Sequence, residues 1–255
     1  MSYDEVTEAL TLTARVAKLM LSNGAASFRT EDTVHRIAAA LQLENLNTFI
    51  TPTGIILTIN NQNRNLGQTL KITSLGVNMS RISALETLSR NMPAHATAAE
   101  IAHCVDQIEA EPSIYSMSMV VIGVGLACGC FAVIQGGGPL EFIAAAIAAG
   151  IAQRVRLRLS TLHTNPYLLT AICSALATFT SYLLTHLLMA PSPRLAIIAS
   201  VLLMVPGVPL ITSMLDIIQL DLISGVSRGI YAVSLLLNIG IGMLIVLVLT
   251  GFAII

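Results

Sequence analysis

The sequence predicts an α-helical polytopic membrane protein, with about five transmembrane helices and an N-terminal cytosolic α+β domain. Of its residues, 55% are hydrophobic and 11% are charged, whereas soluble domains carry about 25% charged residues. The charges are also uneven, because 19 of the 27 Asp, Glu, Lys and Arg side chains lie in residues 1–115. We therefore expect a cytosolic domain at residues 1–115 and a transmembrane domain at residues 116–255.

The first domain shows helices, then strands, then helices, which is the order of an α+β domain. Two amphipathic helices are predicted from apolar residues at three-to-four spacing, at residues 4–24 and 27–43. Two more helices are predicted at residues 81–91 and 97–111. Between these two pairs, NTFITPTGIILTIN (47–60) predicts a β-hairpin. The polar run NNQNRNLG (60–67) predicts a turn before a third strand at TLKITS (69–74).

The second domain contains five apolar stretches, and a helix needs about 20 such residues to cross the hydrocarbon core. The expected spans are residues 116–135, 138–153, 166–190, 194–218 and 227–253. The second is short and carries Glu141, which we interpret as a residue at the membrane rim more readily than as a gate. Small residues recur in GVGLACG, AAAIAAG and NIGIGM, which fits either a tight bundle or an interface with further helices.

The distribution of arginine predicts the orientation in the inner cell membrane. With the N-terminal domain in the cytoplasm, the cytoplasmic loops hold Arg154, Arg156, Arg158 and Arg228, and the outer loops hold Arg194. This agrees with the positive-inside rule, and the acidic N-terminus does not resemble a signal peptide. We therefore expect a multi-pass protein with a cytoplasmic N-terminal domain and the C-terminus outside.

The fourth span is interrupted by Pro206, Gly207 and Pro209. Each proline removes a backbone donor and clashes with the preceding turn, and each unsatisfied group in hydrocarbon costs several kcal/mol. The break is therefore expected to face protein or a watery cavity, as interrupted helices do in transporters. A kink that serves packing alone is the alternative.

Three charged residues follow the break. Asp216, Asp221 and Arg228 either mark the cytoplasmic headgroup region, with Arg228 as counter-charge, or form the inner mouth of a pathway for a proton or cation. The third span carries six hydroxyl residues that either line the pathway or bond back to their own helix. They are Thr170, Ser174, Thr178, Thr180, Ser181 and Thr185.

Several other functions are not supported. In the N-terminal domain no nucleophile lies beside a base and no phosphate loop is found. An intramembrane enzyme is a weaker alternative, because Asp216 and Asp221, five positions apart, do not face each other on one helix. No catalytic residue is therefore expected, and the sequence does not predict an enzyme. Cys128 and Cys130 lack a second Cys or His pair, so no metal site is expected. A net charge of −1 gives no reason to expect nucleic acid as a partner, and no cofactor is implied.

Three stretches together resemble the threonine/serine exporter family, ThrE, and within it the shorter YjjP-like branch. They are GAASFRTEDTVHRIAAAL (24–41), TPTGIILTI (51–59) and LLMVPGVPL (202–210). The most specific are the V-P-G of the fourth span and a cytosolic motif. That motif comprises Gly24, Arg29, Glu31, Asp32 and Thr33.

The resemblance implies export of a small polar metabolite from the cytoplasm, either threonine and serine or a dicarboxylate such as succinate. It also implies a small YjjB-like membrane subunit as partner, self-association, or both, because longer family members carry a further set of spans that this sequence lacks. The alternative from another class is a membrane-anchored regulatory or scaffold protein whose cytosolic domain is the working part.

Overall fold

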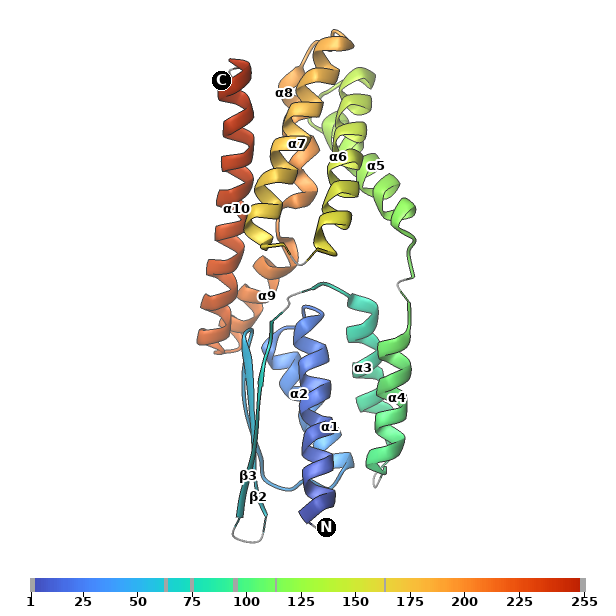
Figure 1. The fold of residues 1–255 in the computed structure, drawn as a ribbon, viewed down its shortest axis with the longest axis vertical. Helices are drawn as coiled ribbons and strands as arrows, with labels where there is room; N and C mark the ends of the chain where they lie inside the picture. The colour runs from blue at the N-terminus through green and yellow to red at the C-terminus, as the bar shows by residue number, and fades with distance from the viewer. Residues whose placement is uncertain are drawn as a thin grey trace. The chain divides into compact units, whose positions relative to one another are not determined.

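The computed structural model describes residues 3–61, 64–73, 76–93, 96–112, 114–162 and 164–252. Its elements form two compact units (Figure 1). The first unit combines the chain up to Pro112 with Gly207–Ile230, and the second comprises the segment between them together with Tyr231 onward. The chain therefore leaves the second unit at Pro206, inside the predicted helix break, and returns to it within a later helix.

The four helices predicted for the N-terminal domain are confirmed, with boundaries shifted by a few residues. They are α1 (Tyr3–Ser22), α2 (Ser27–Ala40), α3 (Met79–Asn91) and α4 (Ala98–Ala110). The start of α3 is capped by Asn78, whose side chain accepts from the Arg81 N–H. At α4, Thr97 and Glu100 form a reciprocal capping box, which satisfies N–H groups that have no partner within the helix.

The strands form one antiparallel sheet in the order β1-β2-β3. They are β1 (Leu46–Thr51), β2 (Gly54–Asn61) and β3 (Arg64–Lys71). The turn predicted over residues 60–67 is wrong for most of its length, because Asn61 pairs with Arg64 and both arms continue as strand. Its tip, residues 62–63, lies outside the described residues, as does Ser74 of the predicted third strand. Pairing with β2 satisfies the backbone of a segment whose composition alone indicates a turn.

The core of the first unit lies between the sheet and the helices. Figure 1 shows β2 and β3 on one side of α1, and α3 with α4 on the other. Ile55 and Leu57 of β2 are fully buried, as are Met20 and Leu21 of α1. This layer fixes the loop between α1 and α2, which carries the start of the cytosolic motif.

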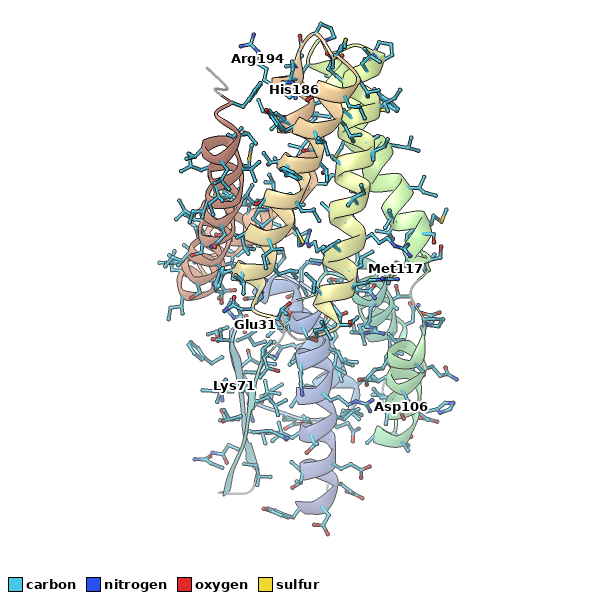
Figure 2. All side chains as sticks on the ribbon, turned by 45° about the horizontal axis from the view of Figure 1, so that its top comes forward. Glu31, Lys71, Asp106, Met117, His186 and Arg194 are labelled. Atoms are coloured by element: carbon cyan, nitrogen blue, oxygen red, sulfur yellow. The ribbon has the colours of Figure 1, made fainter. Side chains whose placement is uncertain are left out.

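The second unit is helical. It contains α5 (Met117–Ile134), α6 (Pro139–Ser160), α7 (Pro166–Leu187), α8 (Pro193–Val201), the 3-10 turn η1 (Leu202–Met204) and the later part of α10 (Leu222–Thr250). His186 in the last turn of α7 and Arg194 in the first turn of α8 lie at one end of this bundle (Figure 2). This end of the second unit therefore carries the polar side chains of His186 and Arg194.

Three described helices are long and apolar enough to cross a membrane: α5, α7 and α10. A fourth span is counted if the bent pair Pro193–Met204 and Gly207–Ile218 forms one broken span. The second expected span lies in α6, which is not among them, since it carries Glu141 near its start and three arginines near its end. The count of about five spans therefore stays a prediction.

Close helix packing explains several of the small residues in the second unit. A Cβ added at Gly125 of α5 would lie 2.7 Å from the Ala146 carbonyl oxygen of α6. One added at Gly242 of α10 would lie 2.3 Å from the Ala171 carbonyl oxygen of α7. Glycine at these positions lets the helix backbones approach each other closely.

Candidate functional site

After the helix break, the chain forms a tight helical hairpin within the first unit. Its arms are α9 (Gly207–Ile218) and the first turns of α10. A Cβ at Gly225 of α10 would lie 2.5 Å from Ile217 Cγ1 and 2.9 Å from the Ser213 carbonyl oxygen. The Ser213 hydroxyl donates a 2.6 Å hydrogen bond to the Gly225 carbonyl. Only glycine at 225 permits this approach of the two arms.

The hairpin is polar inside and apolar outside. Its buried side chains include Thr212, Ser213, Asp216, Ser224 and Arg228. Its exposed side chains include Ile211, Met214, Ile218, Leu220, Leu222, Ile223, Val226 and Ile230. Ionisable residues that face inward from an apolar surface are typical of membrane segments, where they mark functional sites.

A buried ion pair occupies the centre of this polar face. Arg228 Nε lies 2.9 Å from Asp216 Oδ2, and the two side chains are 6% and 0% exposed. One of the two terminal nitrogens of the guanidinium, Nη2, donates a 2.7 Å hydrogen bond to the carbonyl of Ala25. Arg228 is thus the counter-charge of Asp216.

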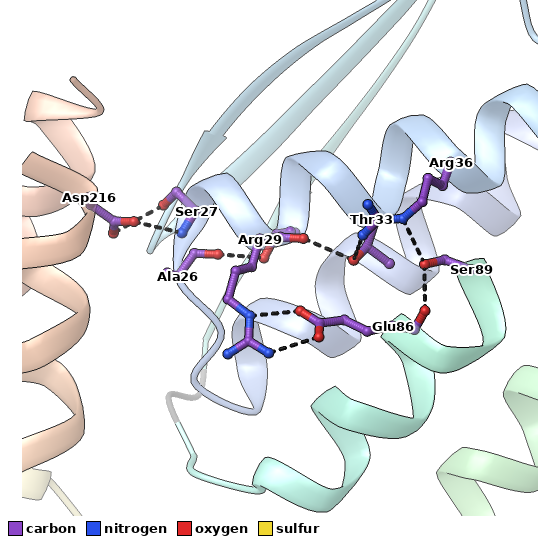
Figure 3. Close-up of polar contacts among 9 residues, drawn as sticks. Ala26, Ser27, Arg29, Thr33, Arg36, Glu86, Ser89 and Asp216 are labelled. Atoms are coloured by element: carbon purple, nitrogen blue, oxygen red, sulfur yellow. Dashed lines mark hydrogen bonds and ion pairs between the residues drawn. The ribbon is translucent and has the colours of Figure 1, made fainter. Parts of the chain in front are cut away.

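The carboxylate of Asp216 lies at the N-terminus of α2 (Figure 3). Its Oδ1 accepts a 2.8 Å hydrogen bond from the Ser27 N–H, and its Oδ2 lies 3.4 Å from the donating Ser27 hydroxyl. Ala26, the N-cap residue of α2, has no side chain that could accept such a bond. Asp216 therefore caps a helix that lacks a local cap, and its charge is favoured by the positive end of the helix dipole.

Gly24 shapes the loop that presents Ala25 and Ser27. Its φ is +93°, a conformation that side-chain-bearing residues rarely adopt, and a Cβ would lie 2.9 Å from the Gly76 carbonyl oxygen. Gly76 and Asn78 in turn donate backbone hydrogen bonds of 2.8 and 2.9 Å to Ser22 and Asn23. The glycine of the cytosolic motif is thus needed for the turn from α1 into α2.

The remaining motif residues mostly fix α2 to its neighbours. Arg29 donates two hydrogen bonds of 2.7 and 2.8 Å to Glu86 of α3 (Figure 3). These bonds hold the pKa of Glu86 below its ordinary value. Glu31 accepts from Thr48 of β1, and Thr33 donates to the Arg29 carbonyl, whereas Asp32 is exposed.

Asp221 lies between the two arms of the hairpin and is partly buried. Its pKa is raised, first by burial and then by the nearby carboxylates of Asp216 and Glu31. Three acidic residues from α9, the hairpin turn and α2 therefore share one negative region, and Arg228 neutralises Asp216 within it.

The break itself is local. The helical segment before it ends with η1 at Met204, Val205 follows, and α9 begins at Gly207 after Pro206. Pro209 then falls in the first turn of α9, where a missing N–H breaks no helical hydrogen bond. Of the two prolines, only Pro206 lies between the helical segments, so the expectation that both prolines interrupt the helix is wrong for Pro209.

The hydroxyl residues of α7 divide into two groups. Thr170, Ser174, Thr180 and Thr185 donate to carbonyls of their own helix. Thr178 and Ser181 are fully buried, and their hydroxyls have no hydrogen-bond partner among the described residues. Most of these hydroxyl groups therefore donate hydrogen bonds to their own helix, which is the second of the two alternatives predicted for them.

Glu141 is fully buried in the first turn of α6, and its position at the membrane rim stays a prediction. Its two carboxylate oxygens accept 2.8 Å hydrogen bonds from the N–H groups of Gly138 and Ser192. It therefore joins the start of α6 to the loop before α8.

Two parts of the site were missed by sequence reasoning. Neither Ser27 nor Ala25 is predicted as a partner of Asp216 or Arg228, although both lie within three residues of Gly24 in the motif. Within the described ranges, no group of three or more His, Cys, Asp and Glu residues could hold a metal ion.

Membrane-length helices and a charged hairpin with an apolar exterior define the class of polytopic membrane proteins to which many transporters belong. The comparison with known families makes this specific. The chain belongs to the family described as "Putative threonine/serine exporter", which matches residues 11–250.

Individual relatives cover nearly the whole chain. It is 28% identical over 243 residues to the "Probable succinate transporter subunit YjjP" of Klebsiella aerogenes, covering 94% of this chain and 93% of that protein. The protein of the same name from Escherichia coli is 27% identical over 240 residues, with 91% of each chain covered. The "Probable threonine/serine exporter" of Mycobacterium tuberculosis is 25% identical over 240 residues, which cover 92% of this chain and 45% of that protein. No solved structure gives a significant match.

Proposed function

We propose that this chain is the larger subunit of an inner-membrane exporter that moves a small polar metabolite out of the cytoplasm. The metabolite would be threonine and serine or a dicarboxylate such as succinate, following the names of the relatives. A small membrane protein would be the second subunit of the exporter, since one group of relatives is named as a subunit. Residues 1–115 would lie in the cytoplasm and the C-terminus outside.

The observation that carries this proposal is the buried Asp216–Arg228 pair inside a hairpin with an apolar exterior. A buried ion pair adds little stability over apolar residues of similar size, because desolvation offsets the attraction of its charges. Ionisable residues that face inward from an apolar segment more often mark a substrate or ion path. The pair also lies only a few turns from the break at Pro206, where α9 begins.

In this mechanism, the break lets α9 change its direction relative to the helix before it. The hairpin carries Asp216 and Arg228, so movement of α9 would open or close their contact with the loop before α2. Broken helices that alternate in this way are a recurring device in secondary transporters.

Export from intact cells tests the proposal. Cells lacking their own exporters of these metabolites would express the chain alone or with a small membrane subunit, and extracellular threonine, serine and succinate would be measured. We expect export only with both subunits. Full export by the chain alone would rule out the partner, and no export of any of the three under either condition would rule out the function.

The mechanism is tested by the triple variant Pro206→Ala, Gly207→Ala, Pro209→Ala, which allows one continuous helix. We expect it to lose most of its export at equal expression. The control is Pro166→Ala, since Pro166 occupies the first turn of α7 and interrupts no helix. Wild-type export by the triple variant would contradict a role for the break.

A further inference from the structure

The groups around Asp216 form a binding site for a carboxylate. The Ser27 N–H and the Ser27 hydroxyl donate to its two oxygens, and the Nε of the Arg228 guanidinium lies 2.9 Å from one of them. They come from α2 and α10, whereas Asp216 comes from α9. A helix N-terminus, a hydroxyl and an arginine are the donors with which proteins commonly bind carboxylates and other anions.

Asp216 fills this site imperfectly. Only the bond from the Ser27 N–H is short, at 2.8 Å, while the hydroxyl of Ser27 lies 3.4 Å away. Arg228 Nε lies at an ion-pair distance from Asp216, yet among the described residues it has no partner with hydrogen-bond geometry. A buried guanidinium N–H left without a hydrogen bond is costly, and a carboxylate not tethered to α9 could satisfy it.

The other arginine–carboxylate contacts of the first unit differ in this respect. The Arg29 side chain, which holds Glu86, is 41% exposed. The Arg15 side chain is 39% exposed, and its partner Asp106 is 60% exposed. Arg228 is the one of the three that is almost fully buried, at 6%.

We propose that the donors around Asp216 bind the carboxylate of the exported metabolite, and that Asp216 occupies this site as an internal substitute when no metabolite is bound. The inference rests on the proposed function for the identity of the ligand. Both candidate substrates, an α-amino acid and a dicarboxylate, share the carboxylate group that the site recognises.

Exchange of one carboxylate for another avoids a large barrier. Removing the only counter-charge of a buried arginine is strongly destabilising, so Arg228 needs an anion in every state of the cycle. An incoming carboxylate supplies it as Asp216 withdraws. The transport cycle would end when the metabolite is released and Asp216 again contacts Arg228 and Ser27.

Occupancy of the site by Asp216 also predicts how mutations change the affinity of the protein for its substrate. A ligand that competes with Asp216 binds with an affinity reduced by the fraction of time for which the site is free. If Asp216 holds the site for nine-tenths of the time, its removal tightens binding about tenfold. Asp216→Asn should therefore bind substrate more tightly than the wild type, and Arg228→Gln should bind it more weakly.

The first experiment uses small carboxylates and does not depend on transport. The full-length protein, purified in detergent, would be unfolded by heat in sodium acetate or in sodium chloride of equal concentration. We expect acetate to stabilise Asp216→Ala by several degrees more than the wild type, because acetate fills the vacated site. The double variant Asp216→Ala, Arg228→Gln should gain nothing beyond the wild type. Glu86→Ala is the control, because it removes the carboxylate partner of a half-exposed arginine.

Equal effects of acetate on all these proteins would overturn the proposal. If Asp216→Ala does not fold, Asp216→Asn takes its place in a binding titration with succinate, threonine and the neutral diamide of succinate. Tighter binding of succinate or of threonine than by the wild type supports the site and distinguishes the two candidate substrates. Binding no tighter than by the wild type, or equal binding of the diamide, overturns it.

The failures of the two proposals are distinguishable. If the protein exports a metabolite but acetate does not stabilise Asp216→Ala more than the wild type, the exporter function stands and the carboxylate site is refuted. If acetate stabilises Asp216→Ala as expected but the protein exports none of the three metabolites, the carboxylate site stands and the proposed function is refuted.

Discussion

Gly242 of α10 provides the sharpest test of how the membrane helices pack. A methyl group at this position would lie 2.0 Å from Ser174 Oγ and 2.3 Å from the Ala171 carbonyl oxygen. The hydroxyl can rotate away, but the carbonyl is held by the backbone of α7. Ordinary contact begins at 3.4 Å, so Gly242→Ala must separate the two helices by about 1 Å.

The cost follows from the core that the two helices share. Ile239 of α10 packs in one cluster with Leu169, Cys173 and Ala177 of α7, and a displaced α10 weakens these contacts. Overpacking of this kind costs about 1–3 kcal/mol, and each kcal/mol lowers Tm by about 2–4 °C in a protein of this size. Relative to a glycine-to-alanine change that causes no clash, we expect a fall in Tm of about 2–12 °C.

The assay is thermal unfolding in detergent with a thiol-reactive dye, in a protein whose exposed Cys130 and partly buried Cys104 are replaced by serine, so that the signal reports exposure of the buried Cys128 and Cys173. Gly240→Ala is the matched control, because a Cβ at Gly240 on the same helix meets nothing within 4 Å. Alanine favours a helix over glycine by about 0.8–1 kcal/mol at both positions, so the difference between the variants isolates the clash. Equal Tm values for the two variants would refute the close crossing of α7 and α10.

Three further predictions concern the first unit. Glu86→Gln should lower stability at pH 7 by about 1–2 kcal/mol. Because Arg29 holds the pKa of Glu86 below 4.5, this loss should vanish as the pH falls through that lowered pKa, which denaturant titrations from pH 3 to 7 would check. Asp221→Asn should raise stability at pH 7 by less than about 1 kcal/mol. Burial and two nearby carboxylates raise the pKa of Asp221 above 3.8, so this gain should shrink as the pH falls toward 3.8, and a constant gain would contradict it. Gly24→Ala should cost at least about 1–2 kcal/mol, because φ is +93° and Gly76 blocks the methyl group; wild-type Tm would count against the strained turn.

Part of the site was visible in the sequence. Asp216 and Arg228 are ionisable residues in or beside apolar runs, which is itself a signal of function. Their pairing was one of two open interpretations, because the turn between them decides whether positions 216 and 228 face each other. The capping of α2 by Asp216 was not foreseen, since the two residues joined by the Ser27–Asp216 hydrogen bond lie 189 positions apart.

Properties that depend on neighbouring residues follow from the amino-acid sequence alone. Periodic apolar positions specified α1 to α4, apolar length specified α5 and α7, and Pro206 placed the helix break. The tertiary structure decided whatever depends on residues distant in the chain. Pairing with β2 made a strand of residues 64–71 despite their turn-like composition, and packing of the hairpin in the first unit brought Asp216 and Arg228 to Ser27. The reason is physical: a backbone segment takes the hydrogen bonds that are available to it, and a buried charge takes the partner that the fold provides.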